Sequence, residues 1–219
     1  MENIPAGKDD VVEREPRGAR RKRATRTKLI EAAFRLMAGK GMEGVAINEI
    51  TEAADVGFGS FYNHFESKEA LYDAVIDAVF EDFADWIDRL VAGVADSAEN
   101  LSVAVRHTLL RAKREPLWGQ FLIREGLSMR SLERGLGRRL FRDIRQGIEE
   151  GRFASPDPFM SFVSVGGTIL VSIAVTITDV RDQQLSREGL AERSAAAVLR
   201  ILGIDADEAD EIARRPLPQ

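Results

Sequence analysis

Apolar residues recur every three or four positions through most of the chain, which is the spacing of helices that bury one face. Nothing alternates with period two over a long stretch, so the pattern predicts an all-α protein with about nine helices in total. The first helix begins at Thr25 and ends before Gly39 and Gly41. Its inward face is made of Leu29, Ile30, Ala33, Phe34 and Met37.

The same period continues toward the C-terminus. A long helix is expected from Lys68 to Gly93, and a very regular one carries five apolar residues at i+4 spacing between Leu132 and Ile148. The stretch 159–178 is rich in β-branched residues, but its length favours a helix, since strands average about five to six residues. A last helix is predicted over 187–202.

Two short helical segments stand between the first helix and the long one. They cover 47–54 and 58–64, and Asp55-Val56-Gly57 separates them. A longer helix followed by two short ones is the layout of a helix-turn-helix unit, whose second short helix lies in the major groove of DNA. The pattern therefore predicts a three-helix DNA-binding domain over 25–70 and a larger helical bundle over 71–219.

The second short segment has a distinctive sequence. The run Gly59-Ser-Phe-Tyr-Asn-His-Phe65, followed by Ser67-Lys-Glu-Ala-Leu71, closely resembles the DNA-binding domain of the TetR family of bacterial transcriptional regulators. The resemblance is strong over residues 25–75. It implies a homodimer that binds double-stranded DNA at a palindromic operator and represses transcription until a small effector releases it. An activator or a corepressor-dependent regulator would use the same residues.

The helix-turn-helix pattern divides its residues between core and DNA. Phe61 and Phe65, four positions apart, are expected to pack inside, which turns their neighbours outward. Base readers are expected to be Phe58, Ser60 and Asn63, with Asn48 a weaker candidate, which favours A·T pairs. The full set of predicted DNA contacts is Arg26, Asn48, Gly57, Phe58, Gly59, Ser60, Tyr62, Asn63, His64 and Lys68.

Some of these residues are expected to hold phosphates or to bring the backbone close to DNA. In the TetR resemblance, Tyr62, His64 and Lys68 bind phosphates, and Arg26 is similarly placed. Gly59 inside a helix costs about 1 kcal/mol relative to alanine. Either a close approach to DNA or tight helix packing explains it.

The chain departs from the TetR pattern at three positions. Ala46 replaces the usual Thr before the second helix and removes a helix cap. Asp55 stands where Gly is usual and must then adopt a positive φ, and Gly57 replaces a Ser hydroxyl. These changes bear on DNA affinity more than on the fold.

Charge is unevenly distributed along the chain. The net charge is −5, yet residues 17–68 carry net +4 and residues 69–219 net −6. Five basic residues fall within Arg17–Arg23, without a large apolar residue among them. Residues 1–24 are therefore predicted to be a basic flexible N-terminal arm. The arm either follows the DNA backbone or remains a solvated tail.

The C-terminal region is expected to bind the effector, because aromatic residues gather there from several predicted helices. In the TetR resemblance such residues line an effector cavity, and a largely apolar or aromatic effector is expected. A packed core is the alternative. The predicted ligand-binding residues are Phe83, Trp86, His107, Arg111, Trp118, Phe121, Phe141 and Phe162.

Dimerisation is assigned to the two last predicted helices. Small residues at i+4 spacing in 159–178 allow another helix to approach closely, and the TetR resemblance implies a four-helix interface with 187–202. The alternative is that this stripe faces its own subunit. The predicted interface residues are Ser164, Thr168, Ser172, Thr176, Val198 and Ile201.

Composition narrows the remaining possibilities. The chain has no cysteine and two histidines, so no metal site and no cofactor are expected. No catalytic motif is present, which leaves a helical enzyme as a remote alternative. The polar first residues are unlike a secretory signal, and eight of the twenty residues in 159–178 are Ser, Thr or Gly. A cytoplasmic protein without a membrane span is expected.

Overall fold

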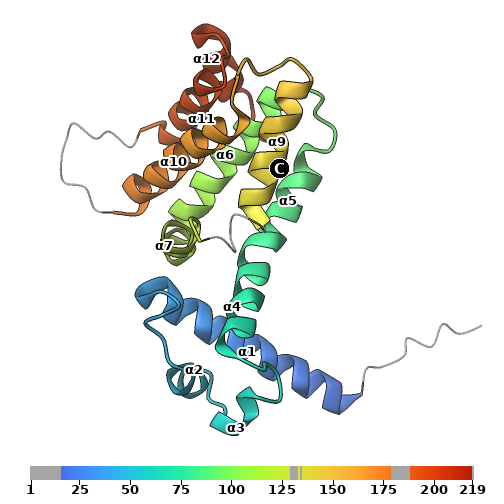
Figure 1. Ribbon diagram of the computed structural model, residues 1–219, viewed down its shortest axis with the longest axis vertical. Helices are drawn as coiled ribbons and strands as arrows, with labels where there is room; N and C mark the ends of the chain where they lie inside the picture. The colour runs from blue at the N-terminus through green and yellow to red at the C-terminus, as the bar shows by residue number, and fades with distance from the viewer. Residues whose placement is uncertain (1–15, 129–132, 134, 179–187, 219) are drawn as a thin grey trace, which may run out of the picture.

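The computed structural model describes residues 16–128, 133, 135–178 and 188–218. Every regular element among these residues is helical, which confirms the all-α prediction. The first helices gather at one end of an elongated molecule, and the bundle of later helices forms the other end (Figure 1). The N-terminal helices are α1 (Arg17–Lys40), α2 (Ile47–Ala53), α3 (Phe58–Phe61) and α4 (Lys68–Ile76).

Helix α1 begins at Arg17 rather than at Thr25. The prediction of a flexible arm is therefore wrong for residues 17–24, and residues 1–15 of that predicted arm lie outside the described residues. Arginine, lysine and alanine are strong helix formers, and extending an existing helix avoids the unfavourable nucleation step. The lack of large apolar residues here shows that the helix is solvated, not that the segment is irregular.

The N-terminal domain has a small core. Leu29, Met37, Ile50, Phe61 and Leu71 are fully buried and come from all four N-terminal helices. The turn between α2 and α3 places Asp55 at φ 54°, as expected at the position where glycine is usual. This turn sets the angle at which α3 leaves the domain.

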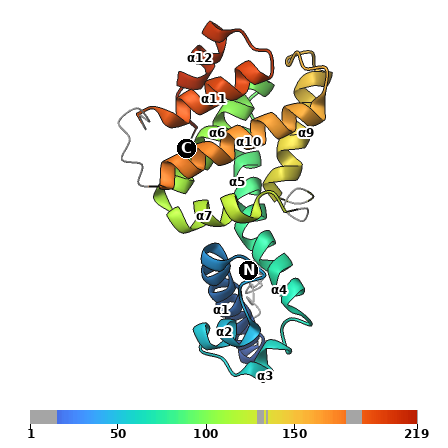
Figure 2. The ribbon, with the colours of Figure 1, turned by 60° about the vertical axis from the view of Figure 1, so that its left-hand side comes forward.

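One long helical rod connects the two ends of the molecule. Helix α4 continues into a π-helical turn, η1 (Asp77–Glu81), and then into α5 (Asp82–Val91). A π turn inside an α-helix is uncommon and often marks a functional site. Figures 1 and 2 show this rod running from the N-terminal domain into the C-terminal bundle.

The C-terminal bundle is built around α6, which packs on α7, α10, α11 and α12 and also contacts α9. Figure 2 shows α10 crossing this bundle beside α6 and α11. Helix α12 follows the expected last helix and was not predicted. The bundle helices are α6 (Ser97–Arg114), α7 (Pro116–Glu125), α9 (Gly135–Glu149), α10 (Pro158–Ile177), α11 (Leu190–Ile201) and α12 (Ala206–Arg214).

The two ends of the molecule also meet where α1 packs on α7. Nearby, the buried Tyr72 hydroxyl on α4 donates a hydrogen bond of 2.7 Å to the Glu125 carboxylate on α7. The Glu125 side chain belongs to a residue that is 7% exposed, so the bond is shielded from water. The N-terminal domain is therefore attached to the bundle through both the rod and this contact.

Candidate DNA-binding surface and effector cavity

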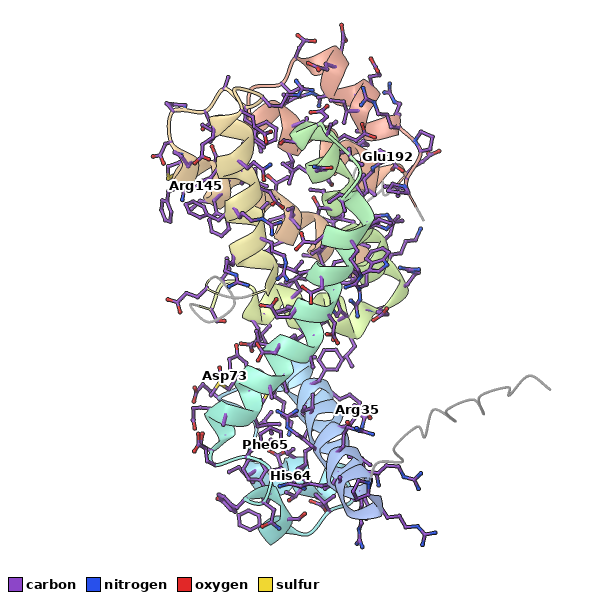
Figure 3. The ribbon with its side chains drawn as sticks, turned by 90° about the vertical axis from the view of Figure 1, so that its right-hand side faces the viewer. Arg35, His64, Phe65, Asp73, Arg145 and Glu192 are labelled. Atoms are coloured by element: carbon purple, nitrogen blue, oxygen red, sulfur yellow. The ribbon has the colours of Figure 1, made fainter. Side chains whose placement is uncertain are left out.

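Helix α3 lies at the far end of the N-terminal domain (Figures 1 and 3), and large side chains in and just after it are exposed. Phe58 is 53% exposed and Tyr62 is 54% exposed, while Phe61 is fully buried and Phe65 is 5% exposed. The predicted core role of Phe61 and Phe65 is confirmed. The rings of Phe58 and Tyr62 meet edge-on at 5.8 Å, and their exposed outer surfaces are suited to an external contact.

The glycines of this surface have free space around them. A Cβ atom added at Gly57 or Gly59 would meet no other atom within 4 Å. Tight packing against another helix, one of the two explanations for Gly59, is therefore wrong. The remaining explanation for Gly59 is that an external molecule approaches the α3 backbone closely.

The other predicted base readers are also accessible. Asn63 and Asn48 are exposed, and Ser60 is partly buried. The short α3 thus presents an aromatic ring, a hydroxyl and an amide on its solvent side. These are groups that contact base edges in a major groove.

A basic strip of α1 lies beside α3. The Arg26 guanidinium carbon is 4.9 Å from the centre of the Phe65 ring. Burial lowers the pKa of His64, and the positive charges of Lys22 and Arg26 lower it further. The Nδ1 atom of this histidine is buried and has no hydrogen-bond partner within the described part of the chain. The residues predicted to hold phosphates are therefore close to further cations.

Lys68 has a structural role that sequence reasoning missed. Its ammonium group donates to the carbonyl oxygens of Met42 at 3.2 Å and Val45 at 3.3 Å, which lie in the loop between α1 and α2. A simple phosphate contact is an incomplete description, because Lys68 also fixes this loop. Removing the side chain is expected to disturb the domain as well as any DNA contact.

The absent cap at Ala46 is partly replaced. The Glu49 carboxylate accepts a hydrogen bond of 3.0 Å from the Ala46 amide and also pairs with Lys40. These two contacts lower the pKa of Glu49, with the Lys40 hydrogen bond the larger cause. Helix α2 therefore keeps one half of a capping arrangement without a Ser or Thr.

Five of the predicted ligand-binding residues form one packed cluster. The ring of Phe83 stacks on Trp86 at 5.6 Å and meets Trp118 edge-on at 5.1 Å. Trp86 contacts His107 at 4.9 Å, and the Arg111 guanidinium lies 4.8 Å from the rings of both Phe83 and Trp118. The sequence correctly placed these residues together, but they contact each other rather than an open space.

The remaining three predicted ligand residues are elsewhere. Phe121 is fully buried and packs on Phe34 of α1 at 5.3 Å, so it joins α7 to the N-terminal domain. Phe141 and Phe162 form a separate pair at 5.7 Å between α9 and α10. None of the eight residues lines the cavity between α5, α6 and α9 or the groove between α10, α11 and α12. The core alternative therefore describes them better, because their rings fill the bundle.

One cavity of about 250 Å³ lies between α5, α6 and α9. One side is apolar, and the α9 side is strongly polar. Sequence reasoning missed this site, although four polar residues at positions 139, 142, 143 and 146 fall on one face of α9. The cavity is lined by Ile87, Asp88, Val91, Ala92, Val94, Ser97, Asn100, Ala104, Arg142, Asp143 and Gln146.

The polar side of this cavity is electrostatically balanced. Arg142 pairs with Asp88 at 2.8 Å and with Asp143 at 2.7 Å. Burial alone would raise the pKa of Asp88, but hydrogen bonds from Arg142 and Arg139 hold it below the usual value. Burial raises the pKa of Asp143 in spite of the Arg142 contact. The buried Oδ1 atom of Asn100 has no hydrogen-bond partner among the residues that the structure describes, which leaves an acceptor in the cavity wall.

Arg139 joins the cavity to the π turn. Its guanidinium donates to Asp88 at 2.8 Å and also pairs with Glu81 and Asp85. The Glu81 carboxylate, in η1, accepts a further hydrogen bond of 2.7 Å from the Gly135 amide at the start of α9. A continuous chain of ion pairs therefore runs from the cavity wall to the rod that leads to α3.

Two of the predicted dimer residues are inside the subunit. Val198 is fully buried, and Ser172 is 9% exposed and accepts a hydrogen bond of 2.9 Å from Ser194 of α11. At these positions the prediction is wrong, because the small-residue stripe lets α11 of the same chain approach α10. Ser164, Thr168, Thr176 and Ile201 remain at least partly accessible.

Larger apolar residues of α10 occupy the outer face instead. Met160 is 51% exposed, Val163 is 45% exposed and Val171 is 64% exposed. Among the described residues α10 is the helix long and apolar enough to cross a membrane, and 17% of its most apolar window is buried. A groove of about 420 Å³ lies next to this face, between α10, α11 and α12. The outer face of α10 is therefore a large apolar surface that no described part of the chain covers.

Comparison with known proteins agrees with this architecture. Residues 29–75 match the family described as bacterial regulatory proteins of the tetR family, and residues 96–215 match the tetracyclin repressor-like C-terminal domain. The crystal structure of RolR in complex with resorcinol is similar with a TM-score of 0.68 and 36% identity, over 92% of this chain and 98% of that chain.

Curated relatives are similar over a shorter stretch. The transcriptional repressor KstR2 of Rhodococcus jostii is 32% identical over 38% of this chain and 41% of its own length. The transcriptional repressor DhaR of a Mycobacterium species is 36% identical over 43% of this chain and 46% of its own length. The chain thus aligns with less than half of these relatives. The two matched domains and the likeness to RolR together show that the chain belongs to the TetR family of helix-turn-helix transcription regulators, which are not enzymes.

Proposed function

We propose that the protein is a cytoplasmic homodimeric repressor that binds a palindromic operator and releases it when a small hydroxylated aromatic molecule enters the α5/α6/α9 cavity. One observation carries the proposal. The continuous rod α4–η1–α5 begins beside α3 and ends in the cavity wall, where it contributes Asp88. One continuous helical rod therefore connects the helix that would contact DNA with the wall of the cavity.

The exposed side of α3 supports DNA reading. Phe58 can pack on a thymine methyl group, and Asn63 can pair with adenine, while Tyr62 is positioned to contact a phosphate. The free space at Gly59 lets the backbone approach the groove closely. A unit this short contacts few base pairs, so useful specificity requires two copies about 34–36 Å apart on one face of the duplex.

The outer face of α10 supports dimerisation. Exposed Met160, Val163 and Val171 share this helix with Ser164, whose small side chain allows close approach. An isologous contact between two copies of α10 would bury all of them, with Ile201 of α11 at the edge. This surface replaces the predicted set that included Ser172 and Val198.

The cavity chemistry supports a small, hydroxyl-bearing ring as the effector. Asp88, Asp143 and the free Asn100 Oδ1 offer hydrogen-bond acceptors, and Arg142 offers donors. The opposite wall, which includes Ile87, is apolar. A volume of about 250 Å³ lies below the usual range of about 300–1,000 Å³ for drug-sized ligands. RolR, which is 36% identical, has been crystallised with resorcinol.

Coupling follows from the ion pairs around Arg139. A ligand that binds Arg142 and Asp143 competes with the Arg142–Asp88 pair and so changes how Asp88 holds Arg139. Arg139 also holds Glu81 in η1, so the rearrangement reaches the middle of the rod, next to α4. A ligand that prefers the rearranged state by about 1–3 kcal/mol would shift the spacing of the two α3 helices enough for regulation.

The test begins with selection of bound duplexes from a random DNA pool. The selected site is then used in fluorescence anisotropy with increasing resorcinol and related monocyclic phenols. We expect a palindromic site, release of DNA by at least one phenol, and loss of base preference in Asn63→Ala. Asp143→Asn should bind the same site but require much more phenol for release, because its acceptor is weakened.

Two results would contradict the proposal. A protein that selects no DNA sequence would remove the regulator function as a whole. A phenol response unchanged by Asp143→Asn and Arg142→Met would place the effector elsewhere. The variant Lys113→Gln, an exposed residue on α6 outside the cavity lining, is the matched control for protein quality.

A further inference from the structure

The first three turns of α1 carry an unusual concentration of positive charge. From position 17 to position 30 there are seven basic residues and no acidic residue. The next acidic residue after this stretch is Glu31. All seven basic side chains are exposed. The set is Arg17, Arg20, Arg21, Lys22, Arg23, Arg26 and Lys28.

We propose that residues 17–28 of α1 form a rigid second DNA-contacting surface, which binds duplex phosphates flanking the bases that α3 contacts. The proposal rests on the proposed DNA-binding function and adds a surface outside the helix-turn-helix unit. It replaces the flexible arm by a helix, so its charges have fixed positions relative to α3. We call residues 17–28 the basic extension.

The basic extension is directed to the correct end of the molecule. Figures 1 and 3 show that the N-terminal end of α1 reaches the same end of the N-terminal domain as α3. Lys22 and Arg26 are close enough to His64, just after α3, to lower its pKa. The cationic surface is therefore continuous from α1 to the recognition helix.

Its length suits more than one phosphate. A rise of about 1.5 Å per residue places Arg17 roughly 14 Å beyond Arg26 along the helix. Phosphates on one strand are spaced by about 3.4 Å along the duplex axis, so this distance spans several of them. A rigid rod of this length can contact backbone beyond the end of the base-reading site.

The energetics of the isolated helix favour an anionic partner. The first turn of α1 contains no acidic residue, although positive side chains near a helix N-terminus oppose the helix dipole by about 0.3–1 kcal/mol each. Like charges such as Lys22 and Arg26, four apart, also repel each other. Duplex phosphates would relieve both effects at the same time.

The test measures how DNA affinity depends on salt. The variant Arg20→Gln/Arg21→Gln/Lys22→Gln removes three charges from the basic extension while glutamine keeps helix propensity. The control Lys113→Gln/Arg114→Gln/Arg145→Gln removes three exposed charges from the C-terminal bundle, where Figure 3 labels Arg145 far from His64. Both proteins are first checked for unchanged helicity and melting temperature by circular dichroism.

We expect the extension variant to bind operator and random DNA more weakly by a similar factor. The slope of log K against log salt should fall by about 0.9 for each lost phosphate contact, so by roughly 1 to 3. The control should keep the wild-type slope. A variant slope equal to wild type, in a protein that still selects its operator, would overturn the proposal. Failure of the wild type to bind DNA would instead overturn the regulator function.

A second variant tests rigidity. Ala24→Pro keeps every charge but interrupts the helix inside the basic extension, between Arg17–Arg23 and the rest of α1. Weaker binding than the Ala24→Ser control is expected, because the charges lose their fixed direction. Equal binding by both would show that a rigid helix is unnecessary. If the triple variant lost affinity for anionic phospholipid vesicles but not for DNA, the partner would be a lipid surface and the proposal would be wrong.

Discussion

The two ends of this molecule present functional side chains in opposite ways. At the N-terminal end, Phe58 and Tyr62 are more than half exposed; Phe58 begins the four-residue helix α3 and Tyr62 directly follows it. At the other end, the charged residues Asp88, Arg142 and Asp143 pair with each other around a cavity. One site is an open surface, and the other is a partly open cavity lined by paired charges.

This difference follows from the size and shape of the proposed partners. A DNA groove is large and contacts a protruding helix, so the residues involved are neighbours in sequence. A small molecule must be surrounded, so its site requires side chains from α5, α6 and α9. Aromatic residues make the contrast clearest, because they are exposed at the first end and packed at the second.

The largest expected effect compares one aromatic residue from each end. Trp118 is 2% exposed and its indole N–H donates to the Val79 carbonyl at 3.3 Å. Trp118→Ala should lower the free energy of unfolding by about 3–5 kcal/mol. Phe58→Ala should change it by less than about 0.5 kcal/mol. Urea unfolding followed by circular dichroism measures both values.

The same pair also separates core from ligand-binding residues. Phe58→Ala is expected to reduce DNA affinity without loss of stability. A Trp118→Ala protein that remains as stable as wild type but no longer responds to phenols would restore Trp118 to the effector site. The aromatic residues of the C-terminal bundle would then be ligand contacts and not only packed core residues, and the contrast with the exposed aromatic residues of the N-terminal end would be wrong.

The next effect concerns the connection between the two ends. Arg139, whose side chain is 13% exposed, pairs with three carboxylates, and Arg139→Met would leave them facing one another. We expect a loss of about 2 kcal/mol of stability, below the about 3–5 kcal/mol of a fully buried pair. Ligand release of DNA should weaken strongly, while operator affinity without ligand changes less.

A matched control lies one and a half turns further along α9. Arg145 forms an exposed i,i+4 pair with Glu149, and both side chains are more than half exposed. Arg145→Met should change stability by less than about 0.5 kcal/mol and leave the ligand response intact. Equal effects of the two substitutions would show that the Arg139 ion pairs do not couple the cavity to η1.

At the N-terminal end, where the functional residues are contiguous in sequence, the sequence was sufficient to predict which side chains are buried and which are exposed. The alternation of Phe61 and Phe65 with Phe58 and Tyr62 predicted which side chains are buried, because a short helix of known period assigns each residue to a face. The extent of α1 was not predicted, since a solvated helix and an irregular arm share the same absence of large apolar residues. Helix propensity of the arginines was the available signal.

The cavity was harder to predict because it depends on tertiary contacts. Aromatic residues in the bundle were assigned to a ligand site by resemblance, but their packing against each other is decided by which helices meet. The pairing of Asp88 on α5 with Arg142 on α9 spans 54 positions in the chain. Only the α9 face itself carried a readable pattern.

A smaller effect is expected from pH. Burial lowers the pKa of His107, a hydrogen bond that the imidazole donates to the Pro218 carbonyl opposes this, and Arg106 and Arg114 lower the pKa further. The unfolded chain therefore binds a proton more readily, so stability is present above the usual pKa of 6.5 and is lost as pH falls below it. The loss approaches at most about 1.4 kcal/mol per pH unit for one group.

The measurement compares melting temperatures between pH 7.5 and pH 5. His107→Gln should show a shallower decrease than wild type in this range. His64, whose pKa is also lowered, should account for part of the remaining slope. A His107→Gln protein with the wild-type pH dependence would show that burial of this imidazole has no energetic consequence. The variant His64→Gln, measured in the same way, gives the corresponding pH dependence of the melting temperature for the DNA-binding end.

The last expected change is a small gain in stability, and it tests the role of α3 at the open end directly. Gly59→Ala adds a methyl group where no atom lies within 4 Å, so the free protein should become more stable by up to about 1 kcal/mol. In the complex the same methyl would stand between the α3 backbone and the DNA groove, and affinity for the selected operator should fall. Gly57→Ala, also in open space but at the start of α3, is the neighbouring control. A Gly59→Ala protein that is more stable than wild type and binds DNA equally tightly would contradict this explanation. Alanine would then stabilise the protein without any loss of DNA binding, so close approach to DNA would not explain the glycine.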